Sequence, residues 1–172
     1  MNDADWKFRG GEYGRHSQVK FPKIPGRDFS GVVAKAGGDL KVGDAVFGVL
    51  EPGREGTYCE KIAIRAAVIA KKPEQLSYVD AAALALTGLT AIDSLENTLK
   101  LKRGETILIQ GGAGGVAGFA IQFAKHLGAR VITTTSAANM DYVRGLGADE
   151  VIDYNKQDFA KVVKNCDAVF ET

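Results

Sequence analysis

The stretch Thr106-Ile-Leu-Ile-Gln-Gly-Gly-Ala-Gly-Gly-Val-Ala-Gly118 decides the fold of this 172-residue chain. It opens with a short apolar run typical of a buried parallel strand and then passes through a glycine-rich loop. A helix follows, in which apolar residues recur at steps of three and four. The apolar residues of this stripe are Val116, Phe119, Ala120, Phe123, Ala124 and Leu127. A strand, a tight loop and a one-sided helix in this order predict the first βαβ unit of a parallel sheet.

The loop itself has the GxGxxG/A spacing of dinucleotide-binding proteins, from Gly112 to Ala117. In that pattern Gly112 makes the tight turn, Gly114 lets a pyrophosphate approach the backbone, and Ala117 keeps the helix close to the strand. The helix begins near Gly115 and Val116, where free N–H groups stabilise an anion. No Gly-Lys-Ser/Thr follows, which excludes a nucleoside triphosphate loop. The sequence therefore predicts dinucleotide binding, with a glycine-rich structural turn as the alternative.

The next strand ends in hydroxyl side chains, Thr133-Thr-Thr-Ser136. NAD sites usually carry an acid at this place for the ribose 2′-hydroxyl, but the first acid here is Asp141, inside the following helix. Hydroxyls and helix amides at Thr135 and Ser136 tolerate a 2′-phosphate that a carboxylate would repel. The sequence therefore favours NADP over NAD, although Ser136 could also simply cap the helix.

The rest of the chain divides into a β-rich part and an alternating part. Residues 29–70 contain short apolar runs broken by glycine turns, including a run at 57–64, and indicate antiparallel strands. Residues 77–99 are rich in alanine and leucine and predict a helix. Beyond them, predicted strands alternate with predicted helices. The strands are expected at 107–109, 131–132, 151–152 and 168–170, and the helices at 116–127, 138–146 and 159–163.

This order predicts an α/β fold with a boundary near residue 99. We expect residues 1–98 to form a β-rich domain with connecting helices, and residues 99–172 to form the first half of a doubly wound sheet. Such a sheet normally continues through a second half, so we expect the sequence to be a fragment of a longer one.

Composition limits the functional classes. The net charge is +1, with 45% hydrophobic and 25% charged residues, which is typical of a soluble globular protein, and nothing in the composition indicates a nucleic-acid binder. The longest apolar run, 81–86, is too short to span a membrane, and no signal core is present, so we expect a cytoplasmic protein. Cys59 and Cys166 form no CxxC, and with only His16 and His126 available we expect no metal site and no disulfide scaffold.

Several motifs together resemble the medium-chain dehydrogenase/reductase superfamily, and within it the zinc-free, NADPH-dependent quinone and enone oxidoreductases. Besides the glycine loop, these motifs are Asn2-Asp-Ala-Asp-Trp-Lys7-Phe-Arg-Gly-Gly, Ile24-Pro-Gly-Arg-Asp-Phe-Ser-Gly-Val-Val, Val42-Gly-Asp-Ala-Val-Phe-Gly, Leu86-Thr-Gly-Leu-Thr90-Ala and Leu146-Gly-Ala-Asp-Glu-Val-Ile-Asp-Tyr154. The resemblance implies a partial GroES-like catalytic domain followed by a partial Rossmann domain. It also implies a homodimer.

The resemblance further implies which residues form the site. Cofactor contacts are implied for Lys7, Thr90, Gly115, Val116, Thr135, Ser136 and Tyr154. Zinc alcohol dehydrogenases carry a Cys where this chain has Asn2, and Gly-His-Glu where it has Gly26-Arg27-Asp28, so no metal is implied. Members of the subgroup often place a Lys or Arg after the Ser at the strand end, whereas this chain has Ala137-Ala138-Asn139. That change removes one cationic partner for the 2′-phosphate.

The implied reaction is hydride transfer from NADPH to a quinone or to the C=C bond of an α,β-unsaturated carbonyl. Without zinc, a hydrogen-bond donor must stabilise the enolate as it forms, and Lys7 and Asn2 are the candidate catalytic residues. The partner is then a small-molecule quinone or enone. Two alternatives stay open: a non-catalytic NADP(H)-binding protein or inactive fragment, and a zinc-type alcohol dehydrogenase.

Overall fold

The structure is a computed structural model that describes residues 2–12, 22–51, 53 and 56–172, so His16 lies outside the described residues. The chain forms two compact units, Met1–Leu86 and Thr87–Thr172, which we describe one at a time. Their boundary lies within a single helix. The division into domains at residues 98 and 99 remains a prediction.

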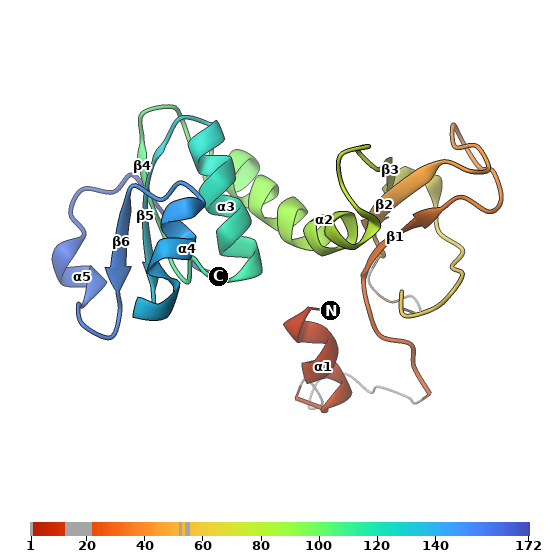
Figure 1. The fold of residues 1–172 in the computed structure, drawn as a ribbon, viewed down its shortest axis with the longest axis horizontal. Helices are drawn as coiled ribbons and strands as arrows, with labels where there is room; N and C mark the ends of the chain where they lie inside the picture. The colour runs from red at the N-terminus through yellow and green to blue at the C-terminus, as the bar shows by residue number, and fades with distance from the viewer. Residues whose placement is uncertain (1, 13–21, 52, 54–55) are drawn as a thin grey trace. The chain divides into compact units, whose positions relative to one another are not determined.

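The first unit is built around a small antiparallel sheet, as the sequence predicts. Its strands pair in the order β1-β2-β3 (Figure 1). In this register Ser30 lies opposite Phe47, and Phe47 lies opposite Ala70. Its elements are α1 (Asp3–Arg9), β1 (Asp28–Val32), β2 (Ala45–Val49), the short 3₁₀ turn η1 (Ala66–Val68) and β3 (Ile69–Lys71).

The prediction of a strand at 57–64 is wrong, and the first two residues of this run bond to the segment around Pro25 instead. The Thr57 N–H donates to the Gly26 carbonyl at 3.2 Å and the Tyr58 N–H donates to the Pro25 carbonyl at 3.1 Å. Pro25 has no N–H to return a bond, so a β-ladder cannot continue through it. The apolar run at 57–64 therefore remains irregular.

The helix predicted at 77–99 is present, but its end is wound differently. Helix α2 (Tyr78–Ile92) begins after Ser77, whose Oγ accepts the Asp80 N–H at 3.1 Å. It continues into a π-helical segment, η2 (Asp93–Thr98), in which each turn is wider than in an α-helix.

Together α2 and η2 form an apolar helical stretch that the sequence reading underestimated. Tyr78–Thr98 has 21 residues and contains an 18-residue window with a mean hydropathy of 1.2, which is long and apolar enough to cross a membrane by length and composition alone. Core helices of soluble proteins meet the same criterion of length and composition, so one such helix is only weak evidence of a membrane span. Ala81, Ala91 and Leu95 on this stretch have 0% exposure.

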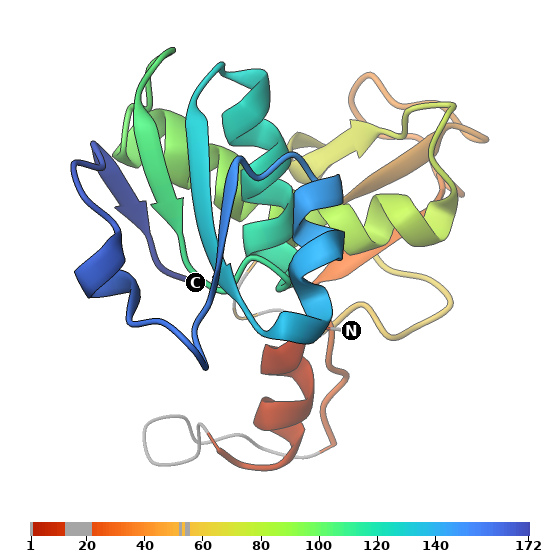
Figure 2. The same cartoon turned by 60° about the vertical axis from the view of Figure 1, so that its left-hand side comes forward.

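The second unit contains a parallel sheet in the order β6-β5-β4-β7, which confirms the predicted alternation. Figure 2 shows the strands running side by side with helices packed against them. The elements after η2 are β4 (Thr106–Ile109), α3 (Gly115–His126), β5 (Arg130–Thr135), η3 (Ala137–Asn139), α4 (Met140–Gly145), β6 (Glu150–Asp153), α5 (Phe159–Val162) and β7 (Ala168–Phe170). The helix predicted at 138–146 is thus divided into a 3₁₀ turn and a short α-helix.

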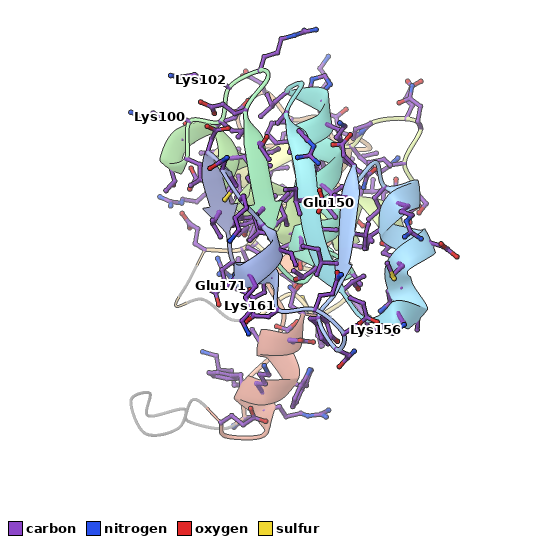
Figure 3. All side chains as sticks on the ribbon, turned by 90° about the vertical axis from the view of Figure 1, so that its left-hand side faces the viewer. Lys100, Lys102, Glu150, Lys156, Lys161 and Glu171 are labelled. Carbon is purple, nitrogen blue, oxygen red and sulfur yellow. The ribbon has the colours of Figure 1, made fainter. Side chains whose placement is uncertain are left out.

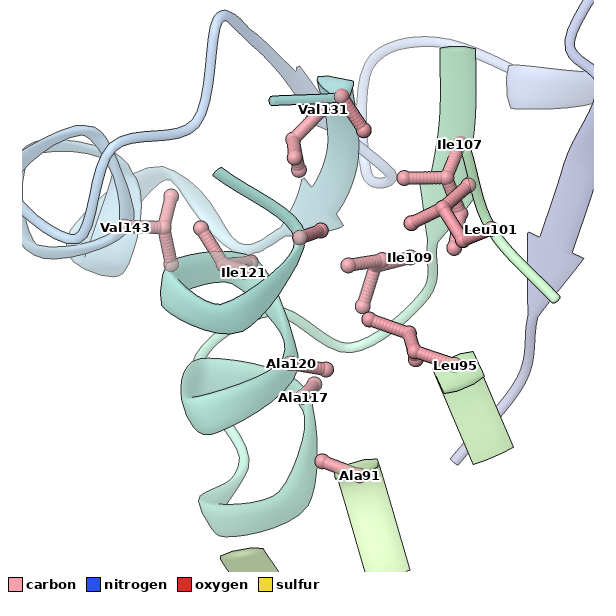
Figure 4. Packing of buried hydrophobic residues seen from close by; sticks show 12 residues of the cluster. Ala91, Leu95, Leu101, Ile107, Ile109, Ala117, Ala120, Ile121, Val131 and Val143 are labelled. Atoms are coloured by element: carbon pink, nitrogen blue, oxygen red, sulfur yellow. The ribbon is translucent and has the colours of Figure 1, made fainter. Parts of the chain in front are cut away.

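The core of this unit lies between the sheet and α3, because alternate strand residues point to opposite faces. The apolar stripe of α3 packs on Ile107, Ile109 and Val131, all with 0% exposure (Figure 4). Leu108, Ile132 and Ile152 point to the opposite face. That face is covered by Phe159, Val163 and Cys166. Burying each large aliphatic side chain contributes about 1.5–3 kcal/mol, so both faces hold the loop between β4 and α3 in place.

Candidate functional site

The glycine loop lies at the carboxyl end of β4, where it turns into α3. Gly112 is buried, whereas Gly114 and Gly115 are exposed. Gly114 has φ −75° and ψ 159°, and its carbonyl accepts the first helical bond, from the Gly118 N–H at 2.7 Å. The exposed backbone at 114–115 therefore opens onto the positive end of a helix.

The inner half of the loop is fixed by the threonines of β5. Thr134 Oγ1 accepts the Gly111 N–H at 3.1 Å, and the Thr134 carbonyl accepts the Gly112 N–H at 2.9 Å. The hydroxyl of Thr133 donates to the Ile109 carbonyl at 2.6 Å, just before the loop begins. Both threonines are buried. The loop thus takes its shape from the neighbouring strand.

Two glycines of the fingerprint meet different surroundings. A Cβ on Gly112 would lie 2.3 Å from Thr133 Oγ1 and 3.1 Å from Ile121 Cδ1, so no side chain fits there. A Cβ on Gly114 would meet only the Gly111 carbonyl oxygen, at 3.2 Å, and would project into the exposed mouth of the loop. Gly112 is required by packing inside the protein, and Gly114 leaves space for a ligand outside it. This cradle fits the pyrophosphate of a dinucleotide.

Three more of the predicted cofactor residues lie at adjacent strand ends. Thr135 ends β5 and Tyr154 follows β6, and the Tyr154 N–H donates to the Thr135 carbonyl at 3.2 Å. The exposed fractions are 2% for Thr135 and 55% for Tyr154, and Ser136 is half-buried. Ser136 and Tyr154 are therefore accessible to a ligand, while Thr135 is part of the core.

Helix α2 brings Thr90 into the same unit as the loop. A Cβ on Gly115 would lie 3.3 Å from Thr87 Cγ2, which shows that the second half of α2 runs beside the start of α3. Thr90 lies one turn beyond Thr87 and is exposed.

The candidate catalytic residues belong to the first unit. Asn2 precedes α1 and its Nδ2 donates to Asp28 Oδ2 at 2.5 Å. The other carboxylate oxygen, Asp28 Oδ1, accepts the Leu86 N–H of α2 at 2.7 Å. Asp28 thereby joins Asn2 to α2. The sequence analysis did not select Asp28 as a site residue. The only sequence signal for it was that it occupies the position of the Glu in the Gly-His-Glu motif of zinc alcohol dehydrogenases.

A second carboxylate, Asp5, holds the start of α1. Its Oδ2 accepts the Asn2 N–H at 2.8 Å and the Tyr58 hydroxyl at 3.1 Å. Burial, and then the bond to Asp5, raise the pKa of Tyr58 above its ordinary value, so this hydroxyl stays a donor. Lys7 on the same helix is half-buried, with its Nζ 5.5 Å from the centre of the Trp6 ring.

Within residues 2–12, 22–51, 53 and 56–172, no group of three or more His, Cys, Asp and Glu side chains is placed to hold a metal ion. Cys59 and Cys166 are free thiols.

Comparisons with known proteins agree with this architecture. Residues 1–74 match the alcohol dehydrogenase GroES-like domain and residues 115–172 match the zinc-binding dehydrogenase domain. The 2-methylene-furan-3-one reductase of Solanum lycopersicum is 36% identical over 100% of this chain and 47% of its own length. The chloroplastic NADPH-dependent alkenal/one oxidoreductase of Arabidopsis thaliana is 36% identical over 99% of this chain and 47% of its own length.

A solved structure has the same fold. The quinone oxidoreductase from Coxiella burnetii superposes with a TM-score of 0.88 at 36% identity, over 98% of this chain and 55% of that one. This chain spans about half the length of the curated relatives it matches. With the glycine loop, the antiparallel sheet and the parallel sheet all in place, the chain belongs to the medium-chain dehydrogenase/reductase superfamily, in the group of the quinone oxidoreductases and enone reductases.

Proposed function

We propose that the protein containing this chain is a zinc-independent oxidoreductase that reduces a quinone or the C=C bond of an α,β-unsaturated carbonyl with NADPH. The observation that carries the proposal is the cradle at Gly112–Gly114, closed inside by Thr133 and open outside at the start of α3. The names of the relatives support it, since they include a furanone reductase and an NADPH-dependent alkenal/one oxidoreductase.

NADPH, when bound, supplies the hydride, and this chain supplies binding and orientation. The residues that would hold the cofactor are Lys7, Thr90, Gly112, Gly114, Gly115, Val116, Ala117, Thr135, Ser136 and Tyr154. Of these, the amides of Gly115 and Val116 would hold the pyrophosphate, and Ser136 and Tyr154 would hold the adenosine end.

For catalysis, Asn2 and Lys7 are the proposed donors to the substrate oxygen, on which negative charge develops. The amide of Asn2 has two N–H bonds, and one of them is directed to Asp28. Asp28 would therefore fix the plane of the amide and leave the second N–H for the substrate. Asn2 and Arg27 stand where zinc alcohol dehydrogenases carry Cys and His, and these two differences support a reaction without zinc.

The test is the loss of NADPH absorbance with a quinone or an enone as acceptor, together with a titration of NADPH. Gly114→Val is expected to abolish NADPH binding in a folded protein, because the side chain fills the space that the pyrophosphate needs. Binding without turnover would favour the non-catalytic alternative. Unchanged NADPH affinity in folded Gly114→Val would overturn the assignment of the loop.

We also propose a cytoplasmic homodimer. The two free thiols, Cys59 and Cys166, support a reducing compartment. Several relatives are named as chloroplastic or mitochondrial, so cell fractionation is the direct test of the compartment. Light scattering after size-exclusion chromatography tests the dimer.

A further inference from the structure

The segment that follows the end of β5 carries no cation near Ser136. Ser136 is followed by Ala137 and Ala138, and neither can pair with a 2′-phosphate. Arg144, on the helix that follows, pairs instead with Asp141 at 2.9 Å near the far end of that helix. A preference for NADPH then needs a positive charge from another element.

The turn after β6 brings such a charge to the end of β5. Asp153 lies opposite Thr135 in the parallel register, and Tyr154 is bonded to the Thr135 carbonyl. The N–H groups of Lys156 and Gln157 both donate to the Asp153 carbonyl at 3.0 Å, which folds the turn back toward the strand end. Lys156 therefore lies on the turn next to the segment that holds Ser136.

The side chain of Lys156 is free to reach a ligand. Its exposed fraction is 76%, and its Nζ lies 3.8 Å from Asp153 Oδ2, which is a long ion pair. Asp153 is only 7% exposed in its side chain, and its Oδ1 accepts the Asn155 N–H at 3.0 Å. The carboxylate is thus turned inward, and the charge offered to solvent is positive. Figure 3 shows Lys156 at the carboxyl end of the strands, near the start of α4, while Lys161 lies on α5.

We propose that Lys156 recognises the 2′-phosphate of NADPH, together with the Ser136 hydroxyl, and so sets the preference for NADPH over NADH. The ammonium would make a charge-assisted hydrogen bond to the phosphate, which is absent from NADH. This inference rests on the proposed dinucleotide function and adds a specificity-determining residue to it. It also gives the adenosine end a cation, which Ala137 and Ala138 cannot supply.

The experiment compares Lys156→Met with Lys161→Met in the protein containing this chain. Lys161 is a matched control, because it is 82% exposed and pairs with Asp158 at 3.4 Å in the same i,i+3 arrangement. NADPH and NADH are titrated by their fluorescence, and 2′,5′-ADP and 5′-AMP are titrated as competitors that contain only the adenosine end. Thermal unfolding confirms that both variants fold.

We expect Lys156→Met to weaken NADPH and 2′,5′-ADP about tenfold, which corresponds to about 1.4 kcal/mol, and to leave NADH and 5′-AMP unchanged. Lys161→Met leaves all four affinities unchanged. In the unsubstituted protein the preference for NADPH falls as salt is added, since exposed charges are screened, and in Lys156→Met this salt dependence is lost.

An unchanged NADPH affinity in Lys156→Met, an equal loss for NADPH and NADH, or an equal loss in Lys161→Met would each overturn the proposal. These failures differ from failure of the proposed function. If the unsubstituted protein binds neither dinucleotide, the proposed function fails and the role of Lys156 fails with it. If it binds NADH and not NADPH, dinucleotide binding stands, but the proposed use of NADPH is refuted together with the role of Lys156. If it binds both equally, the proposed function stands and only the role of Lys156 is refuted.

Discussion

Gly112→Ala is the substitution that tests most directly how the glycine loop is built. The added Cβ would lie 2.3 Å from Thr133 Oγ1 and 3.1 Å from Thr133 Cγ2, both inside the core. The loop and β5 cannot move apart without breaking the 2.9 Å hydrogen bond from the Gly112 N–H to the Thr134 carbonyl. The expected result is a large loss of stability in the second unit.

The magnitude follows from two terms. Forcing one extra methyl group into a packed core costs about 1–3 kcal/mol. Displacing the Thr133 hydroxyl also breaks its bond to the Ile109 carbonyl, which contributes about 1 kcal/mol. Gly112→Ala should therefore lower the free energy of unfolding by about 2–4 kcal/mol.

The assay is urea unfolding followed by circular dichroism, with Gly114→Ala as the matched control. Gly114 already has a φ of −75°, which any residue adopts, so its alanine variant should unfold within about 0.5–1 kcal/mol of the unsubstituted protein. It should nonetheless bind NADPH more weakly. Thr133→Ala creates space for the new methyl group, so the double variant Gly112→Ala/Thr133→Ala should lose less stability than the sum of its parts. A Gly112→Ala variant as stable as the unsubstituted protein, or strict additivity in the double variant, would refute the reasoning.

Three further predictions concern the carboxylates and one cap. Burial raises the pKa of Asp149, but the hydrogen bonds from Lys125 and the backbone outweigh it and hold that pKa below its ordinary value of 3.8. The ionised carboxylate therefore stabilises the fold at pH values above its pKa in the unfolded chain. This stabilisation is lost as the pH falls through the lower pKa of the folded protein. Because this carboxylate is 36% exposed, Asp149→Asn should cost only about 1 kcal/mol at neutral pH and should flatten the acid side of a stability-against-pH curve measured with urea. Asp28→Ala should lower kcat more than KM, because Asn2 loses the acceptor that orients it, while Asp28→Asn, which keeps one acceptor oxygen, should recover part of kcat in the same steady-state assay. Ser77→Ala removes the side-chain cap of α2 and should lower the midpoint of thermal unfolding by the equivalent of about 1 kcal/mol, whereas an unchanged midpoint would show that the cap is not needed.

Local patterns predicted the parts of this fold that local patterns control. The apolar stripe of α3 recurs at steps of three and four, and β4 to β7 are short continuous apolar runs. Both patterns lie within one segment, and the structure has the helix and the four strands near the expected residues. The run at 57–64 has a similar composition but forms no strand, because its partner segment contains Pro25. Whether an apolar run becomes a strand depends on the segment it meets, and that is a tertiary property.

The same limit applies to the candidate site. The spacing of the glycine fingerprint predicted special positions at Gly112 and Gly114, which lie within one turn of each other, but the side chain that crowds Gly112 is Thr133 of the next strand. The bond between Asn2 and Asp28 joins residues 26 apart in the sequence, and the contribution of Asp28 to α2 spans 58 residues. Lys156 was missed for a related reason. Its proposed role depends on the register that places Asp153 opposite Thr135, and no pattern within one segment of the sequence shows that pairing.

The two β5 threonines also determine how a ligand meets the glycine loop. Because Thr133 and Thr134 belong to the core strand, the inner half of the loop becomes ordered when the sheet folds, and the entropy cost of about 1–2 kcal/mol per residue is met at that stage. A dinucleotide then encounters a rigid receptor, so association should proceed in a single kinetic phase whose rate is linear in ligand concentration. The amide hydrogens of Gly111 and Gly112 should be as protected from solvent exchange in the free protein as those of the strands on either side.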